Sequence, residues 1–286
     1  MKKAIKAASV MVLILLFPLM SYSQGYLFII GGGNRSPEMM TKFVELAEKV
    51  KSGKIIVFPM ASSVPEEVGP EQAQELRDLG AQSVEYHILN RDQALKNENT
   101  SILDEVGGVF FSGGVQSRLT DVLRDTPVHK KLLKIHKEGA VIGGTSAGAA
   151  VMSEIMITGD EKRREEDETS FSTIEIDNIV TVPGFGFIKS AIIDQHFIAR
   201  KRHNRLLSLV AEHPQLLGIG IDESTAIVVK PDETFEVIGE SHVIVYDASG
   251  ANRAALPSHN LSVHGMIMHI LKPGDQFNLS VHKVME

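Results

Sequence analysis

The chain has 286 residues, of which 43% are hydrophobic and 23% charged, and this ordinary globular composition allows one large domain or two small ones. The formal net charge of −7 excludes general nucleic-acid binding, because that function requires a basic face. Cysteine is absent, which excludes disulfide bonds, a cysteine nucleophile and a thiolate metal site.

The first 23 residues have the pattern of a secretory signal peptide. A lysine-rich start leads into an apolar run over residues 10–20, and small side chains at Ser21 and Ser23 precede Gln24. An uncleaved anchor is the alternative, although the apolar run is short for a membrane span. We expect cleavage after Ser23, which gives a secreted or periplasmic protein with no membrane span in the mature chain. Its formal net charge is about −10.

Residues 24–286 are predicted to form a single α/β domain, since strands and helices alternate along the first half without a linker or an internal repeat. Buried strands are expected at 26–30, 54–59, 84–89, 106–111 and 140–142, with helices at 37–50, 65–79, 116–124 and 127–138. This rhythm favours a doubly wound, mostly parallel sheet flanked by helices, in which ligands bind at the carboxyl ends of the strands.

The second half has a different pattern. A charged run at 161–170 indicates a solvated surface loop, with a lid over the site as the alternative. A short strand at 192–194 leads to a helix that carries three arginines and ends near Ala211. A buried strand at 217–221 then precedes a C-terminal β-meander. Its strands are expected at 226–229, 235–238 and 243–246, with one or two edge strands beyond Gly250.

Glycine turns follow three of the predicted strands, at 31–33, 113–114 and 143–144, and they should meet at one edge of the sheet. The turn at 31–33 lacks the spacing of a dinucleotide fingerprint, and the chain has no phosphate-binding loop of the type G-x-x-x-x-G-K-[ST]. We therefore expect no cofactor, and no metal.

Residues 144–148 read G-x-S-x-G after an apolar strand, which is typical of a nucleophile at the tip of a strained strand-to-helix turn. Ser146 is the candidate nucleophile, and the amide of Ala147 would stabilise an oxyanion beside it. The Gly113-Gly114 turn is the natural source of a second donor, with Gly114 in the oxyanion hole. An ordinary glycine- and alanine-rich corner is the alternative.

A serine hydroxyl needs a base within hydrogen-bond reach. Of the 11 histidines, His196 alone ends an apolar strand beside polar residues at the expected catalytic edge. The acid that would orient it is left open by local reasoning, and the candidates are Glu223, Asp222, Asp194 and Glu154. With Glu223, the order serine, histidine, acid differs from that of the α/β-hydrolases, which argues against a lipid esterase.

Polar residues near these positions are candidates for substrate contacts. Gln116 follows the Gly113-Gly114 turn, and Asp194 would point the same way as His196 on a strand. Arg200, Arg202 and Arg205 could grip substrate carboxylates, and the alternative is that they are solvated at the surface.

Four blocks of the sequence resemble the cyanophycinases, in the peptidase family that also contains aspartyl dipeptidases of the peptidase E type. They are FSGGVQSRL (111–119), GGTSAGAAVMS (143–153), IIDQHFIARKRHNRL (192–206) and GIGIDESTA (218–226). With the strand order, the resemblance spans roughly residues 26–246. It implies a class I glutamine amidotransferase-like or flavodoxin-like sheet.

The resemblance implies a serine hydrolase with Ser146 as nucleophile, His196 as base and Glu223 as orienting acid. It also implies substrate contacts from six residues, namely Gln116, Asp194, Gln195, Arg200, Arg202 and Arg205. Members of this family are typically dimers, so a homodimer is expected.

The implied substrate is cyanophycin, a polyaspartate whose side-chain carboxyls carry arginine, from which the enzyme would release β-aspartyl-arginine dipeptides. The family commonly has GGDQ where this chain has Gly113-Gly114-Val115-Gln116, and the lost carboxylate weakens the prediction of a cationic substrate group. The alternatives are an exported aspartyl or isoaspartyl dipeptidase and a binding protein that has lost turnover. An exported enzyme would digest polymer released by other cells.

Overall fold

The computed structural model describes residues 24–163, 171–255 and 258–286. The predicted signal peptide, residues 1–23, and residues 164–170 of the charged run lie outside the described residues, so the structure does not test either prediction. In the part of the chain that is described, no helix is both long enough and apolar enough to cross a membrane.

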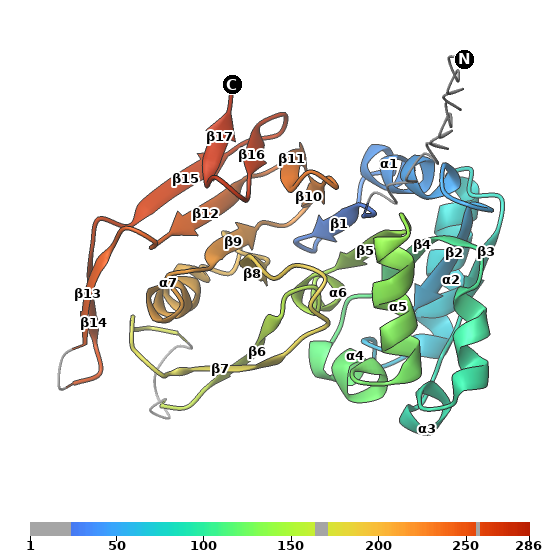
Figure 1. Cartoon of the computed structure of the whole chain (residues 1–286), viewed down its shortest axis with the longest axis horizontal. Helices are drawn as coiled ribbons and strands as arrows, with labels where there is room; N and C mark the ends of the chain where they lie inside the picture. The colour runs from blue at the N-terminus through green and yellow to red at the C-terminus, as the bar shows by residue number, and fades with distance from the viewer. Residues whose placement is uncertain (1–23, 164–170, 256–257) are drawn as a thin grey trace, which may run out of the picture.

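A mixed sheet, nine-stranded within the described residues, runs through the molecule (Figure 1). Its parallel half has the order β1 (Leu27–Ile30), β5 (Val141–Thr145), β4 (Val106–Phe111), β2 (Lys54–Phe58) and β3 (Val84–Tyr86). Beyond β1 the sheet continues antiparallel through β10 (Thr225–Val229), β11 (Thr234–Gly239), β16 (Gln276–Asn278) and β17 (Lys283–Met285). The predicted α/β fold with a parallel core and antiparallel C-terminal strands is confirmed.

Helices cover both faces of the parallel half, because alternate residues of each strand point to opposite sides. One face packs against α1 (Pro37–Glu48) and α2 (Pro65–Asp78), and Phe43 of α1 meets Phe28 and Phe110 edge to face. The other face packs against α4 (Gln116–Leu123), α5 (Pro127–Lys137) and α6 (Ala147–Ala150), with α3 (Arg91–Ala94) and a 3₁₀ turn (Asn97–Leu103) beside them. The sheet is therefore doubly wound, as predicted.

Capping residues explain where α1 and α5 begin. The Ser36 hydroxyl accepts a hydrogen bond from the Met39 amide at 3.2 Å, and Thr126 does the same for His129 at 3.2 Å. Each cap is followed by a proline at the first helical position, where the missing N–H costs nothing.

A second sheet lies beside the first and supplies the other half of the site (Figure 1). In the described residues its order is β15 (Ile267–Leu271), β12 (Val243–Asp247), β9 (Leu217–Ile221) and β8 (Ala191–Gln195), with β8 and β9 parallel. Helix α7 (His203–Glu212) packs on this sheet. Two hairpins complete the fold, β6 (Ile155–Glu161) with β7 (Ile179–Pro183) and β13 (Asn252–Ala255) with β14 (Leu261–His264).

The structure corrects several details of the second half. Strand β12 leaves the predicted meander and pairs with β9 and β15, whereas β10 and β11 form the expected hairpin. The arginine-bearing helix begins at His203, so Arg200 and Arg202 lie in the turn before it. Five strands follow residue 250 in the described chain, whereas one or two were expected. The sequence does not reveal the others because these short strands carry mostly exposed side chains and lack a buried pattern.

Candidate active site

Three side chains from the ends of three strands form a hydrogen-bonded chain. Ser146 follows β5, His196 follows β8 and Glu223 comes two residues after β9. Ser146 Oγ lies 2.8 Å from His196 Nε2, and Glu223 Oε1 accepts from His196 Nδ1 at 2.6 Å. Because the carboxylate holds the proton on Nδ1, Nε2 is left as the acceptor for the serine hydroxyl.

Ser146 sits in a strained turn between β5 and α6. Its φ of 52° and ψ of −107° belong to a sparsely populated region for a residue with a side chain. The turn is fixed by the Ser146 amide, which donates to the Ile30 carbonyl of β1 at 3.0 Å. A Cβ at Gly148 would overlap the Phe111 carbonyl, so the small residues of the G-x-S-x-G pattern let α6 pack directly on β4.

The Gly31-Gly32-Gly33 turn holds the histidine in place. The His196 amide donates to the Gly31 carbonyl at 2.8 Å. Gly32 has a φ of 112°, and a Cβ there would come within 2.5 Å of His196 Nε2. The imidazole therefore occupies space that only glycine leaves open. The sequence pattern predicts this turn at the catalytic edge but gives no sign of its contact with the base, because the two residues are more than 160 positions apart.

Asp222 and Glu223 have different hydrogen-bond partners, and the partners show which acid orients His196. Asp222 accepts from the amides of Ile198 and Ala199 at 3.0 and 2.9 Å and from the Ser241 hydroxyl at 2.7 Å. Asp222 thus fastens the turn that follows His196, while Glu223 contacts the imidazole.

Burial sets the protonation of the imidazole. It lowers the pKa of His196 below its ordinary value, and the hydrogen bond that His196 donates to Glu223 only partly opposes this. The nearby Arg200 lowers the pKa of His196 further. At neutral pH His196 is therefore neutral and able to accept a proton from Ser146.

Two backbone segments flank the serine where an oxyanion hole would lie. Ala147 is the first residue of α6, a position whose N–H has no partner within a helix. On the other side, a Cβ built on Gly113 would lie 3.6 Å from the Ser146 Cβ. The adjoining turn through Gly114 is fixed by the Val115 amide, which donates to the Ala61 carbonyl at 2.9 Å. Ala147 and Gly113 thus lie beside the nucleophile, and Gly114 is the next residue of that turn.

The three arginines have different surroundings. Arg205 forms a buried, bidentate ion pair with Asp194, whose Oδ2 accepts from Arg205 Nε at 2.7 Å. Arg202 donates to the backbone and side-chain oxygens of Gln195, and burial lowers the pKa of Arg202 to about 10. The Arg200 side chain is 55% exposed, and its Nε lies 3.9 Å from Glu223 Oε1. Arg200 is therefore free to contact a ligand. Arg202 and Arg205 instead bind Gln195 and Asp194 within the protein.

Gln116 is buried at the start of α4, and its amide nitrogen already has partners. Nε2 donates to the carbonyls of Ile157 and Thr158 at 2.8 and 2.9 Å, which fastens the β6–β7 hairpin to the start of α4. Glu154, the remaining acid considered from the sequence, lines a separate cavity. No cluster of three or more potential metal ligands occurs among residues 24–163, 171–255 and 258–286.

A serine activated by a histidine and a carboxylate, on a doubly wound sheet, defines a serine-type hydrolase. The model of "Peptidase family S51" matches residues 27–237. The chain belongs to this family and is a serine peptidase.

Curated relatives extend the likeness over most of the chain. A cyanophycinase from Geminocystis herdmanii is 32% identical over 273 residues, covering 92% of this chain and 97% of the relative. A cyanophycinase from Trichormus variabilis is 36% identical over 237 residues, covering 81% and 77%.

Solved structures share the fold. A peptidase from an acI-B1 actinobacterium has a TM-score of 0.64 at 22% identity, covering 90% of this chain and 98% of that one. A putative peptidase E from Listeria monocytogenes has a TM-score of 0.51 at 19% identity, covering 76% and 100%.

Proposed function

We propose that this protein hydrolyses cyanophycin to β-aspartyl-arginine dipeptides through an acyl-enzyme. The observation that carries the proposal is the hydrogen-bonded chain from Ser146 through His196 to Glu223, in a family whose curated relatives are cyanophycinases. The family supports the substrate, and the geometry supports the reaction.

The mechanism follows from the two hydrogen bonds. Ser146 Oγ attacks the scissile carbonyl carbon while its proton passes to His196 Nε2. The resulting oxyanion is stabilised by the amides of Ala147 and Gly114. His196 returns the proton to the leaving amine as the C–N bond breaks. A water molecule then attacks the acyl-enzyme carbonyl and loses a proton to His196, which passes it to Ser146 Oγ as the ester bond breaks and the acid product leaves.

The exposed Arg200 is the group that meets a substrate carboxylate in this proposal. The Asp194–Arg205 ion pair and the Arg202–Gln195 contact hold the turn that presents it. Asp194, Gln195, Arg202 and Arg205 thus act by positioning, and Gln116 fixes the neighbouring hairpin.

One observation favours a second candidate, an aspartyl or isoaspartyl dipeptidase. Val115, beside Gly114, has an exposed side chain where the family commonly has aspartate. An apolar group there offers no partner to a guanidinium, whereas a small peptide without arginine needs none.

The N-terminal pattern supports export, with the mature chain beginning at Gln24 in the periplasm or outside the cell. The protein would then act on polymer released by other cells. We also propose that it is a homodimer, as members of the family typically are.

The test is to incubate purified residues 24–286 with insoluble cyanophycin and to identify the soluble products by mass spectrometry. Release of β-aspartyl-arginine, abolished in Ser146→Ala, is the expected result. No release from cyanophycin together with cleavage of aspartyl or isoaspartyl dipeptides would replace the first candidate by the second.

A further inference from the structure

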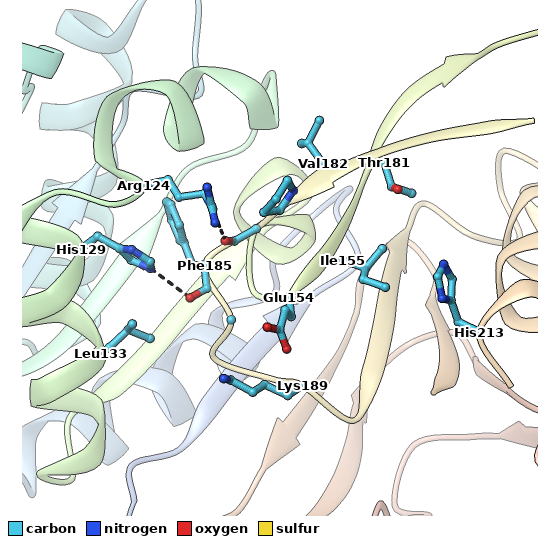
Figure 2. Close-up of a pocket in the computed structure, with 13 residues that line it drawn as sticks. Arg124, His129, Leu133, Glu154, Ile155, Thr181, Val182, Phe185, Lys189 and His213 are labelled. Atoms are coloured by element: carbon cyan, nitrogen blue, oxygen red, sulfur yellow. Dashed lines mark hydrogen bonds between the residues drawn. The ribbon is translucent and has the colours of Figure 1, made fainter. Parts of the chain in front are cut away.

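A cavity away from the catalytic residues carries unpaired charges of both signs (Figure 2). Its volume of about 560 Å³ is in the range of small-molecule sites. Arg124 and α5 side chains form one side, Glu154 and Lys189 lie in the middle, and His213 lies on the other side.

This cavity is distinct from the catalytic site. Lys189 precedes β8 and His196 follows it, so the two residues lie at opposite ends of the strand. At the rise of an extended strand, seven residues correspond to roughly 20 Å. A ligand in this cavity would therefore not touch Ser146 directly.

Several lining groups have partners and are structural. His129 Nε2 donates to the Phe185 carbonyl at 3.0 Å, while its Nδ1 accepts from the Asp125 amide at 3.2 Å. Arg124 Nε donates to the Gly184 carbonyl at 3.2 Å and its Nη1 pairs with Asp125 Oδ2 at 2.5 Å, so that within the described residues only Nη2 of its guanidinium remains for a ligand. These contacts fix the wall on the α5 side.

The groups in the middle are unpaired. Within the described residues, the side chains of Glu154 and Lys189 form no hydrogen bond or ion pair, and both residues are exposed. Apolar surface from Leu133, Ile155 and Val182 surrounds them. The cavity thus offers a carboxylate, an ammonium and an apolar wall for an alkyl stem.

A second cavity adjoins the first and shares Leu133, Gly186 and Lys189 with it. It adds Lys137 and Lys230 as cations and Glu233 as an anion. Positive and negative side chains therefore continue along the surface beyond the first cavity. A ligand with repeated charged units could contact both cavities.

We propose that the cavity around Glu154 and Lys189 is a secondary binding site for an aspartyl-arginine unit. Glu154 receives the guanidinium, Lys189 and Nη2 of Arg124 receive the arginine carboxylate, and the apolar wall receives the arginine methylenes. The ligand is a unit of the polymer or the released dipeptide, which share the arginine guanidinium, methylenes and carboxylate. The inference rests on the proposed function, because that function supplies the ligand.

The test uses Ser146→Ala, with and without the pair Glu154→Gln and Lys189→Gln. Sedimentation with insoluble cyanophycin measures polymer binding, and calorimetry with β-aspartyl-arginine measures dipeptide binding. Lys130→Gln and Glu98→Gln, exposed and outside both cavities, are the charge-matched controls. We expect the cavity pair to weaken binding roughly tenfold or more, as for a lost charge-assisted contact, and the control pair to leave it unchanged.

The two arms identify the source of the ligand. If the cavity pair sediments less with insoluble cyanophycin, the site binds the polymer. If only its binding of β-aspartyl-arginine is weaker, the site binds the product. With Ser146 intact, the cavity pair should lower the rate at limiting polymer while the rate on a small soluble substrate stays the same. If the cavity pair binds both cyanophycin and β-aspartyl-arginine as tightly as Ser146→Ala alone does, the inference is overturned and the proposed function is unaffected. If the protein with Ser146 intact releases no dipeptide from cyanophycin, the proposed function fails and this inference fails with it.

Discussion

Neighbouring carboxylates in the chain serve different parts of the site. Glu223 orients His196 and would stabilise the imidazolium, whereas Asp222 fastens the turn at Ile198 and Ala199. Arg200 acts on the same imidazole through space, since its charge lowers the pKa of His196. Mutation of single residues should therefore distinguish the catalytic role of Glu223 from the structural role of Asp222.

Exchange of the two acids for amides should separate these roles. Glu223→Gln keeps the shape but removes the charge beside His196, so kcat should fall about 10³–10⁴-fold with the melting temperature nearly unchanged. Asp222→Asn removes the charge that strengthens the hydrogen bonds from Ile198 and Ala199 and reverses the one with Ser241, so it should lower the melting temperature instead. Steady-state kinetics and thermal melts measure both. A kcat in Glu223→Gln like that of the unmutated protein would remove Glu223 from the catalytic chain.

The pH dependence of kcat/KM should have an acid limb set by His196. Because burial lowers the pKa of His196, the limb should lie below the ordinary 6.5, and activity should rise with pH through it. Arg200→Gln removes a charge that lowers this pKa, so the limb should move to higher pH, and KM for peptides with free carboxylates should rise. An unshifted limb with an unchanged KM would assign Arg200 to the surface.

At the scale of elements, the parallel half was predictable because β1, β2, β4 and β5 are continuous apolar runs bounded by glycine turns. The C-terminal strands were not, since β13 and β17 are short and exposed, and β12 pairs with β9 from a distant segment. Ser146 and His196 were predictable as catalytic residues because each directly follows an apolar strand. The choice of Glu223 over Asp222 needed the family resemblance, because it depends on which partner each side chain meets in space.

The turn at Gly31-Gly32-Gly33 gives a prediction at this scale. Gly32→Ala would place a methyl group against the His196 ring, so the ring must move and kcat should fall at least about 10-fold. Gly250→Ala is the matched control, because a Cβ there meets nothing within 4 Å. The comparison of kcat in the two variants is the measurement. Equal activity would show that the base tolerates displacement.

At the scale of the whole molecule, the catalytic chain bridges two sheets. Ser146 follows a strand of the large sheet, while His196 and Glu223 follow strands of the smaller one. The junction is held by backbone contacts, such as the Ser224 amide donating to the Gly32 carbonyl at 2.8 Å. The geometry of the site therefore depends on the packing of the two sheets, and anything that loosens their packing should lower activity.

Stability of the molecule should fall in mild acid because of a buried histidine. Burial lowers the pKa of His136 to about 4, below its unfolded value near 6.5. The unfolded chain then binds more protons between these values, so this contribution is complete above pH 6.5 and is lost as the pH falls toward 4. Between pH 7 and pH 5 the loss is about 2 kcal/mol.

Urea unfolding at both pH values tests this contribution. In His136→Asn the difference in unfolding free energy between pH 7 and pH 5 should shrink by about 2 kcal/mol. The exposed His264→Asn is the control and should keep the full difference. A difference that survives in His136→Asn would place the acid sensitivity elsewhere in the molecule.

The most direct test of Ser146 as the nucleophile is covalent labelling. The protein is treated with a fluorophosphonate and digested, and the modified peptide is mapped by mass spectrometry. We expect one adduct on Ser146, absent from Ser146→Ala and formed much more slowly in Glu223→Gln. No adduct on Ser146, or hydrolytic activity retained in Ser146→Ala, would contradict it.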